Sequence, residues 1–276
     1  MTVSVPPAEQ RRGGIFKDTW VVARRGLKHM IRQPEALSDV TIQPIMFVLL
    51  FAYVFGGAIA VQGSNYREFL MGGIFAQTIV FGAFNVAIAL AYDRANGAID
   101  RFRSLPMARG SVLAGHALAS LVRSVLPITL MSLCGLIVGW RIRDGVVDAV
   151  SAYALMFLFT FAIIWVGVLM GSLLPSPEAV QGFAFAIIFP ITFVASTFVP
   201  LNTLPGPLQT VAAWNPVTSM SDALRELFGN RRGFVPEPNA DWPVRHPVAY
   251  TFIWIVGIIV VCAPLAVRQY SRTIDD

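Results

Sequence analysis

The chain has 276 residues, of which 55% are hydrophobic and only 13% are charged, with a formal net charge of +5. An ordinary soluble domain has about 25% charged residues, so too little polar surface is present here to cover a water-soluble globule. Apolar stretches of roughly 20 residues, each long enough to cross about 30 Å of hydrocarbon, recur along the chain. These features predict an all-α integral membrane protein.

The first 36 residues divide into two parts. Residues 1–14 contain two prolines, paired glycines and two arginines, so we expect a disordered tail. Residues 15–36 predict an amphipathic helix, because apolar side chains including Trp20 recur at three- and four-residue steps opposite Lys17, Arg24, Lys28 and Arg32. A basic helix of this kind is typical of one that lies in the headgroup plane of a membrane, and packing on soluble protein is the alternative.

The next part of the chain, residues 37–268, predicts a transmembrane domain, and residues 269–276 predict a short polar tail. Pro190 lies inside the fifth apolar run and predicts a kink there. Gly167 and Gly171 permit close packing of the fourth run, but this spacing is weak evidence for a dimer. The six spans are predicted at about 40–61, 69–92, 117–140, 147–174, 182–199 and 248–267.

The stretch between the fifth and sixth spans is long and partly apolar. Pro207 to Trp214 predicts a short helix, and Asn215 predicts the N-cap of a second helix that has Pro216 in its first turn and ends at Gly229. Because both segments are too apolar for a free loop, we expect short helices that dip into the membrane edge.

The most charged short segment between two apolar runs extends from Asp93 to Arg109 and reads D-R-A-N-G-A-I-D-R-F-R-S-L-P-M-A-R. Its charged and apolar side chains predict a short helix at the membrane face that a soluble partner binds. The alternative is a solvated basic loop. Six spans place this segment and both termini on one side, which has thirteen Lys and Arg residues against seven on the other, and this bias makes that side cytoplasmic.

Catalytic signatures are absent from the sequence. Neither of the two lysines follows glycine in a phosphate-binding loop, so we expect no cofactor in this chain. The three histidines are dispersed and form no metal-binding motif, so we expect neither a metal site nor an enzyme. Cys134 and Cys262 lie in different apolar runs and are interpreted as small buried hydrophobic residues. The basic residues form no face interleaved with aromatics, which argues against nucleic acid.

Two separated motifs resemble one family. The segment N-G-A-I-D-R-F-R-S-L-P-M at Asn96 to Met107 is similar to the cytoplasmic segment of type-2 ATP-binding-cassette (ABC) permeases, especially the daunorubicin-resistance branch. A second stretch also resembles this branch: F-V-P-L-N-T-L-P-G-P-L-Q at Phe198 to Gln209, followed by W-N-P-V-T at Trp214 and A-L-R at Ala223. The order of these motifs and of the predicted spans matches over nearly the whole chain.

The resemblance implies a permease subunit of a bacterial drug or lipid exporter in the cytoplasmic membrane. A separate ABC ATPase subunit would bind ATP and Mg²⁺, and a second permease, identical or paralogous, would complete the path. The 15–36 helix would be the family's connecting helix, and residues 200–230 its external re-entrant helices. Glu178 departs from the basic residue expected in this branch, so an ATPase contact of the Pro175–Glu178 turn is not carried over. The residues implied in coupling to the ATPase are Asp93, Arg94, Asp100, Arg101, Phe102, Arg103 and Leu105.

Four polar residues within the spans are candidates for a substrate path: Gln77, Asn85, Thr192 and Ser196. For the two amides, hydrogen bonding between helices is favoured over substrate contact. The largely apolar surroundings of all four suit an amphiphilic drug, antibiotic, lipid or polyketide better than an ion or a sugar. The alternative functions are a polysaccharide- or glycolipid-exporting permease of the same superfamily and a non-transporting membrane immunity or signalling subunit.

Overall fold

The computed structural model describes residues 34–56, 59, 61, 65–96, 109–231 and 240–275. The predicted tail 1–14, nearly all of the predicted amphipathic helix and the segment that holds Asp100, Arg101, Phe102, Arg103 and Leu105 lie outside these residues.

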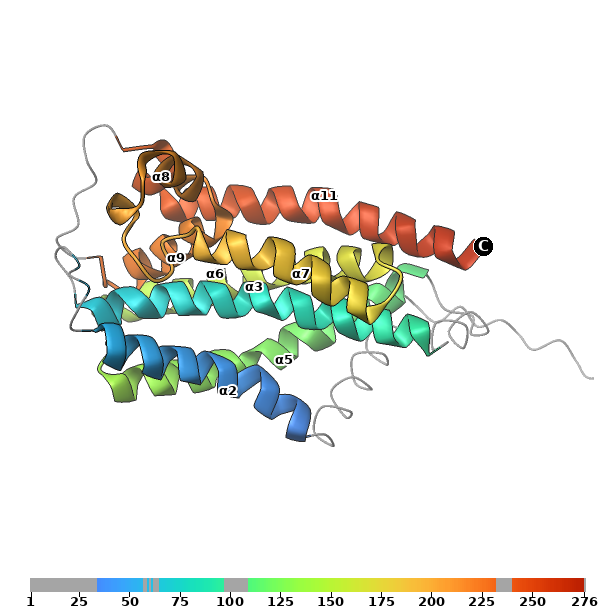
Figure 1. The fold of residues 1–276 in the computed structure, drawn as a ribbon, viewed down its shortest axis with the longest axis horizontal. Helices are drawn as coiled ribbons and strands as arrows, with labels where there is room; N and C mark the ends of the chain where they lie inside the picture. The colour runs from blue at the N-terminus through green and yellow to red at the C-terminus, as the bar shows by residue number, and fades with distance from the viewer. Residues whose placement is uncertain are drawn as a thin grey trace, which may run out of the picture.

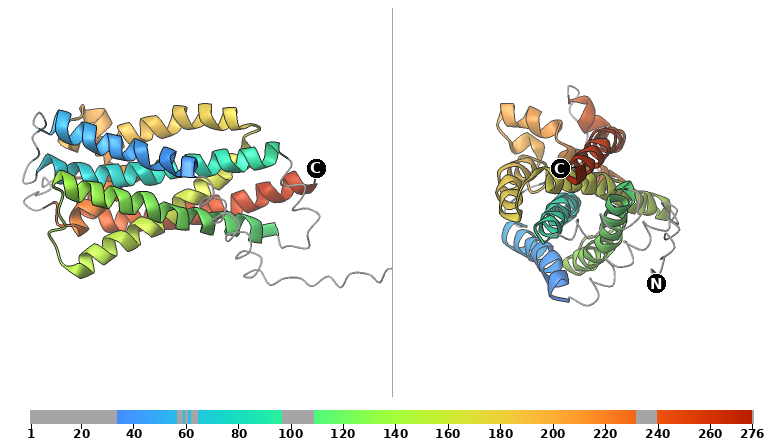
Figure 2. Two further views of the ribbon diagram at one scale, coloured as in Figure 1. Left: turned by 90° about the horizontal axis from the view of Figure 1, so that it is seen from below. Right: turned by 90° about the vertical axis from the view of Figure 1, so that its right-hand side faces the viewer.

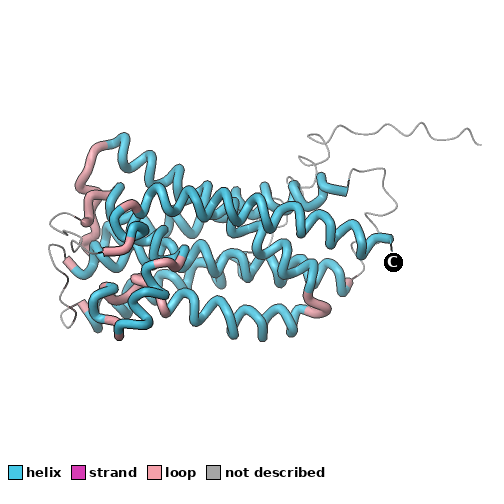
Figure 3. Tube along the Cα trace, turned by 90° about the horizontal axis from the view of Figure 1, so that it is seen from above, coloured by secondary structure: helices cyan, strands magenta, loops and turns pink. Residues whose placement is uncertain are grey.

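The described residues form helices joined by loops, and none of them lies in a strand (Figure 3). A π-helical turn, η1 (Phe51–Phe55), directly follows the first helix, and η2 (Leu201–Thr203) is a 3₁₀ turn. The α-helices are α2 (Pro34–Leu50), α3 (Tyr66–Ala95), α5 (Arg109–Val138), α6 (Val146–Leu173), α7 (Pro177–Phe193), α8 (Gly206–Ala213), α9 (Pro216–Leu227), α10 (Trp242–Arg245) and α11 (Pro247–Asp275).

The long helices run side by side and give the bundle two distinct ends (Figures 1 and 2). One end, here called the α9 end, carries the short helices α8, α9 and α10 (Figure 1). The opposite end, here called the C-terminal end, carries the end of α3, the α6–α7 turn and the end of α11 (Figure 1).

Local signals explain where several helices begin and end. The Asn65 side chain accepts a hydrogen bond from the Arg67 N–H at the start of α3. At the start of α9, Asn215 accepts from the Val217 N–H at 2.8 Å, and Pro216 occupies the first helical position. Gly229 follows α9 with a φ of +70°, a conformation that glycine adopts readily. The predicted N-cap and C-terminal glycine of this helix are confirmed.

The fifth predicted span differs from the observed helix. Residues 182–199 were expected to cross, whereas α7 begins at Pro177, because Ser176 caps it, and ends at Phe193. The helix continues through Pro190. The Asn215 amide donates to the carbonyls of Ile191 and Val194, so the short-helix region binds the carbonyls at the end of α7.

Four helices are long and apolar enough to cross a membrane among the residues that the structure describes: Tyr66–Ala95, Ala117–Val138, Val146–Leu173 and Pro247–Gln269. Two shorter apolar helices occupy Ile42–Phe55 and Pro177–Phe193. The outward face of α11 is apolar, with Ile253, Val256 and Val260 each more than half exposed. Apolar helices with apolar exposed faces are consistent with an integral membrane protein.

The central helix of the bundle is α3, which neighbouring helices surround in the end-on view (Figure 2). Its buried side chains form a hydrophobic core with side chains of α6, α7 and α9. Gly167 and Gly171 of α6 face the carbonyls of Ala83 and Ala87 of α3, with no room for a Cβ at either glycine. The two glycines therefore serve helix packing within the chain.

Candidate functional site

At the C-terminal end of α3, two residues of the predicted coupling segment are described. Asp93 and Arg94 are both partly exposed. The Arg94 Nη1 donates to the carbonyls of Gly171, Ser172 and Leu174 at 3.1, 2.8 and 3.1 Å. A cation at the end of α6 complements the partial negative charge of its unpaired carbonyls.

Arg94 thus joins α3 to the α6–α7 turn. This turn contains Pro175 and Pro177, which cannot donate backbone hydrogen bonds, so few local donors are available for the carbonyls that end α6. The coupling role predicted for Arg94 and its neighbours stays a prediction. The structure assigns Arg94 an intramolecular partner that the sequence did not indicate.

The four candidate path residues come from α3 and from the end of α7, and they differ in burial. Gln77 is buried and Asn85 is exposed, both on α3. Thr192 is fully buried, and its hydroxyl donates to the carbonyls of Ile188 and Phe189 within α7. Ser196 is buried beyond the end of α7. Contact of any of them with cargo stays a prediction.

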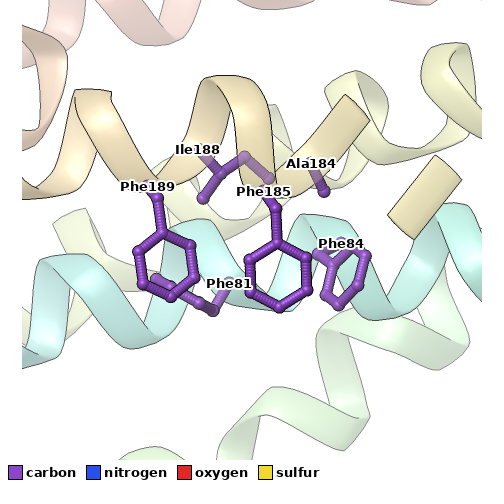
Figure 4. A pocket seen from close by; sticks show the side chains of 6 residues that line it. All are labelled: Phe81, Phe84, Ala184, Phe185, Ile188 and Phe189. Carbon is purple, nitrogen blue, oxygen red and sulfur yellow. The ribbon is translucent and has the colours of Figure 1, made fainter. Parts of the chain in front are cut away.

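A small pocket lies between α3 and α7 (Figure 4). Every side chain that lines it is apolar: Phe81, Phe84, Ala184, Phe185, Ile188 and Phe189. Phe81 packs edge-on against Phe189 with ring centroids 5.5 Å apart, and Phe84 packs similarly against Phe185 at 6.2 Å. The pocket offers aromatic faces and edges to a ligand, with no hydrogen-bonding side chain.

Aromatic contacts continue from this pocket to the α9 end. The rings of Phe189 and Phe193 are stacked at 5.4 Å, and Phe193 contacts Phe198 at the same distance. Phe198 in turn stacks on Phe51 of η1 at 4.2 Å. These rings form a continuous phenylalanine series from the middle of α7 to η1.

A buried polar group at the α9 end was not predicted from the sequence. It comprises Phe69, Ser196, Asp222 and Arg225, and is called the Arg225 cluster below. The Arg225 side chain is only 2% exposed and its Nη1 lies 2.6 Å from the Asp222 carboxylate. The sequence-based topology counts Arg225 among the seven Lys and Arg residues on the side opposite the Asp93–Arg109 segment, and the structure shows that its side chain points into the protein.

Three separate segments meet at Arg225. Its Nε donates to the Phe69 carbonyl of α3 at 2.8 Å, and the guanidinium carbon lies 3.6 Å from the centre of the Phe69 ring. Its Nη1 and Nη2 donate to the hydroxyl and carbonyl of Ser196 at 2.9 and 2.5 Å. Burial lowers the pKa of Arg225 from its ordinary value, and the charge of Asp222 opposes this shift.

Two glycines of α3 make this close contact possible. A Cβ at Gly72 would clash with the Arg225 side chain and the Ser221 carbonyl, and one at Gly73 would clash with the Thr197 carbonyl. The glycine pair and the A-L-R motif, which puts an arginine next to an apolar helical stripe, were the sequence signals for this cluster.

A second set of polar contacts secures the same end. Glu68 of α3 is buried, and it accepts hydrogen bonds from Arg143 at 2.6, 2.9 and 3.1 Å. The hydrogen bond and charge of Glu68 raise the pKa of Arg143. The Trp140 indole donates to Asn230 at 2.7 Å, which ties the α5–α6 loop to the end of α9.

No group of three or more His, Cys, Asp and Glu side chains suitable for a metal ion occurs in the described ranges.

Comparisons with known proteins agree with this architecture. The family described as ABC-2 type transporter matches residues 17–228. A daunorubicin resistance ABC transporter permease protein of Streptomyces coeruleorubidus is 31% identical over 250 residues, which are 91% of this chain and 83% of that protein. A probable doxorubicin resistance ABC transporter permease protein of Mycobacterium tuberculosis is 26% identical over 264 residues, covering 95% and 91% of the two chains.

A third relative, a putative transport permease of Cyanophora paradoxa, is 25% identical over 219 residues, covering 78% of this chain and 75% of that protein. The family match covers more than half of the chain, and the Streptomyces relative aligns along most of both sequences. The chain belongs to the ABC-2 type transporter family of membrane permeases.

Proposed function

We propose that this chain is the permease subunit of an exporter that moves a hydrophobic or amphiphilic compound out across the cytoplasmic membrane. The energy would come from ATP, which a separate ABC ATPase subunit binds with Mg²⁺ and hydrolyses. The observation that carries this proposal is the 31% identity to a daunorubicin resistance permease over 91% of the chain. The cargo class, a drug, antibiotic, lipid or polyketide, is supported by the apolar lining of the pocket between α3 and α7.

Six spans are part of the proposal. The four long apolar helices supply four crossings, and the shorter apolar helices Ile42–Phe55 and Pro177–Phe193 would supply the other two. Ile42–Phe55 has 14 residues and would measure about 21 Å at 1.5 Å per residue, so it would cross only part of the hydrocarbon. The membrane would have to be thinner there, or the rest of α2 would have to extend the crossing.

The C-terminal end would face the cytoplasm, with both chain termini. This orientation places the Asp93–Leu105 segment where an ATPase subunit can bind it, and α8 and α9 on the external side. Two permease subunits would assemble with two ATPase subunits. The sequence-based count of thirteen Lys and Arg residues on the predicted cytoplasmic side against seven on the other supports this orientation.

Efflux measurements test the transport proposal. The chain is co-expressed with candidate ABC ATPase subunits of the same genome. Doxorubicin is added outside inverted membrane vesicles, where export appears as uptake into the vesicle, and its fluorescence reports that uptake. ATP-dependent uptake that requires both subunits supports the proposal. Uptake that is independent of this chain, with every ATPase tested, contradicts it.

Co-purification tests the ATPase contact separately. Replacing Asp100 and Arg101 by alanine is expected to abolish co-purification of the ATPase while membrane insertion is retained. The matched control replaces Asp241 and Arg245, one acidic and one basic residue at the α9 end, by alanine and should leave co-purification unchanged. Equal ATPase recovery with both variants would overturn the assignment of the coupling segment.

A further inference from the structure

Three helices of this chain are joined along their length by contacts that resist sliding. In the middle of the bundle, the backbones of α3 and α6 are in contact because Gly167 and Gly171 meet the carbonyls of Ala83 and Ala87. Backbone atoms cannot change rotamer to relieve a clash, so a shift of one helix along the other costs more here than between flexible side chains.

The same two helices are joined again at the C-terminal end. Arg94, in the last turn of α3, donates to three carbonyls at the end of α6. A displacement of the chain that follows α3 is therefore applied to α6 as well as to α3.

At the opposite end, α3 is joined to α9 by the Arg225 cluster. Arg225 binds the Phe69 carbonyl and packs on its ring, while Asp222 and Ser196 hold the guanidinium in place. Gly72 and Gly73 bring α9 and the residues after α7 against the α3 backbone. Phe69 and Arg94 are 25 positions apart in one helix, which is roughly 37 Å at 1.5 Å per residue.

The contacts of α7 with α3 are of another kind along most of its length. They are made through side chains, among them the Phe81–Phe189 and Phe84–Phe185 pairs, and they leave the apolar pocket between the two helices. The residues after α7 are packed more closely: Ser196 binds Arg225, and the Thr197 carbonyl lies against Gly73 of α3. The start of α7 is held near α3 by the bond of Arg94 to the Leu174 carbonyl and by the buried Val180. The middle of α7, beside the pocket, packs on α3 through side chains and can therefore move relative to α3 while both ends of the helix stay attached.

We infer that α3, α6 and α9 form one rigid unit that carries movement of the segment after α3 to the opposite end of the bundle, with Arg94 and Arg225 as its two positioning residues. This inference rests on the proposed function, which supplies the partner that moves the segment. It adds a route by which the displacement passes through the permease. The α9 end responds because α3 transmits the displacement, and the pocket changes shape because α7 does not move with α3 along its whole length.

Double electron–electron resonance (DEER) distance measurements on the complex with its ATPase test whether α3, α6 and α9 move as one unit. Spin labels are placed at exposed positions on α3 and α9, Tyr92 and Glu226, or on α3 and α7, Tyr92 and Phe183, after replacing Cys134 and Cys262. Labelled chains are mixed with excess unlabelled chains. Between the nucleotide-free and ATP-trapped states, the Tyr92–Glu226 distance should stay constant and the Tyr92–Phe183 distance should change.

A double-mutant cycle on ATP-driven doxorubicin uptake supplies a second test. Asp222→Asn with Arg225→Gln leaves no unpaired charge buried, and Arg94→Gln alters the other end of α3. Each is expected to lower uptake by at least tenfold per correctly assembled permease, and the combination should be no worse than the more severe of the two. Distant sites that act independently would multiply their losses. Glu226→Gln, at an exposed ion pair, is the control and should stay within twofold of the unmodified chain.

The results separate the two proposals. A Tyr92–Glu226 distance that changes with nucleotide, multiplied losses, or unaltered uptake in the variants would overturn the rigid unit while transport by the unmodified chain stands. Absence of ATP-dependent uptake by the unmodified chain would instead overturn the proposed function.

Discussion

The two arginines that bind α3 differ in how their charge is accommodated. Arg225 is almost completely buried, and a carboxylate, a hydroxyl, three backbone carbonyls and an aromatic ring surround it. Arg94 is partly exposed, and the described partners of its guanidinium are the carbonyls at the end of α6. Protein groups have replaced water around Arg225, whereas Arg94 donates hydrogen bonds to the carbonyls at a helix terminus.

This difference indicates how strongly each site depends on its arginine. Removal of Arg225 leaves Asp222 buried without its counter-charge, and water cannot easily reach it. Removal of Arg94 leaves carbonyls that lie near the surface and can bond to water or headgroups. The α9 end should therefore be the more sensitive to substitution of its arginine.

The largest effect is expected for Arg225→Ala. Breaking a buried pair by removing one partner costs about 3–5 kcal/mol, so this variant should lose monodisperse protein and show a much lower unfolding temperature in detergent. Replacing both charges, with Arg225→Met and Asp222→Leu, should recover a large part of the stability because no charge is left unpaired.

The exposed pair at the same end is the control for this prediction. Glu226 is half exposed and lies 3.5 Å from Arg231, so Glu226→Ala should change stability by less than about 1 kcal/mol. Equal losses for Arg225→Ala and Glu226→Ala would show that burial does not distinguish the two pairs.

The next effect concerns the glycines that bring the α9 end against α3. In Gly73→Ala, the added methyl group would clash with the Thr197 carbonyl, and relief of such overpacking costs about 1–3 kcal/mol. At Gly82 in the same helix nothing lies within 4 Å of an added Cβ, so Gly82→Ala should be neutral or raise stability by up to about 1 kcal/mol. Thermal unfolding of both variants, monitored by size-exclusion chromatography, measures the difference in stability between Gly73→Ala and Gly82→Ala.

Much of the helical framework could be predicted from the sequence because apolar length is a strong signal in membrane proteins. The predicted ranges 69–92, 117–140 and 147–174 correspond to α3, α5 and α6 within a few residues at most boundaries. Asn215 and Gly229 defined α9 because capping chemistry is local. The end of α7 was missed because the amide that binds its last carbonyls comes from Asn215, more than 20 residues away.

The polar contacts were harder to predict because their partners are also far apart in the sequence. Arg225 has no distinguishing feature in the sequence other than an apolar stripe beside it, and its partners Phe69 and Ser196 are 156 and 29 residues away. The count of Lys and Arg residues therefore only assigned it to the side opposite the Asp93–Arg109 segment, with no partner. Gly167 and Gly171 were recognised as a close-packing pair, but the sequence does not specify which helix approaches them, and the structure shows α3.

The smallest effect is expected at the C-terminal end. Arg94→Ala removes three hydrogen bonds and a favourable charge at the end of α6, which should cost about 1–2 kcal/mol because part of this loss is replaced by solvent. Arg94→Lys keeps the charge and should retain about half of the stability that alanine loses. Thermal unfolding should rank the unmodified chain above Arg94→Lys and Arg94→Lys above Arg94→Ala. If Arg94→Ala is instead as damaging as Arg225→Ala, the two ends of α3 depend equally on their arginines, and burial of Arg225 is not what makes the α9 end sensitive.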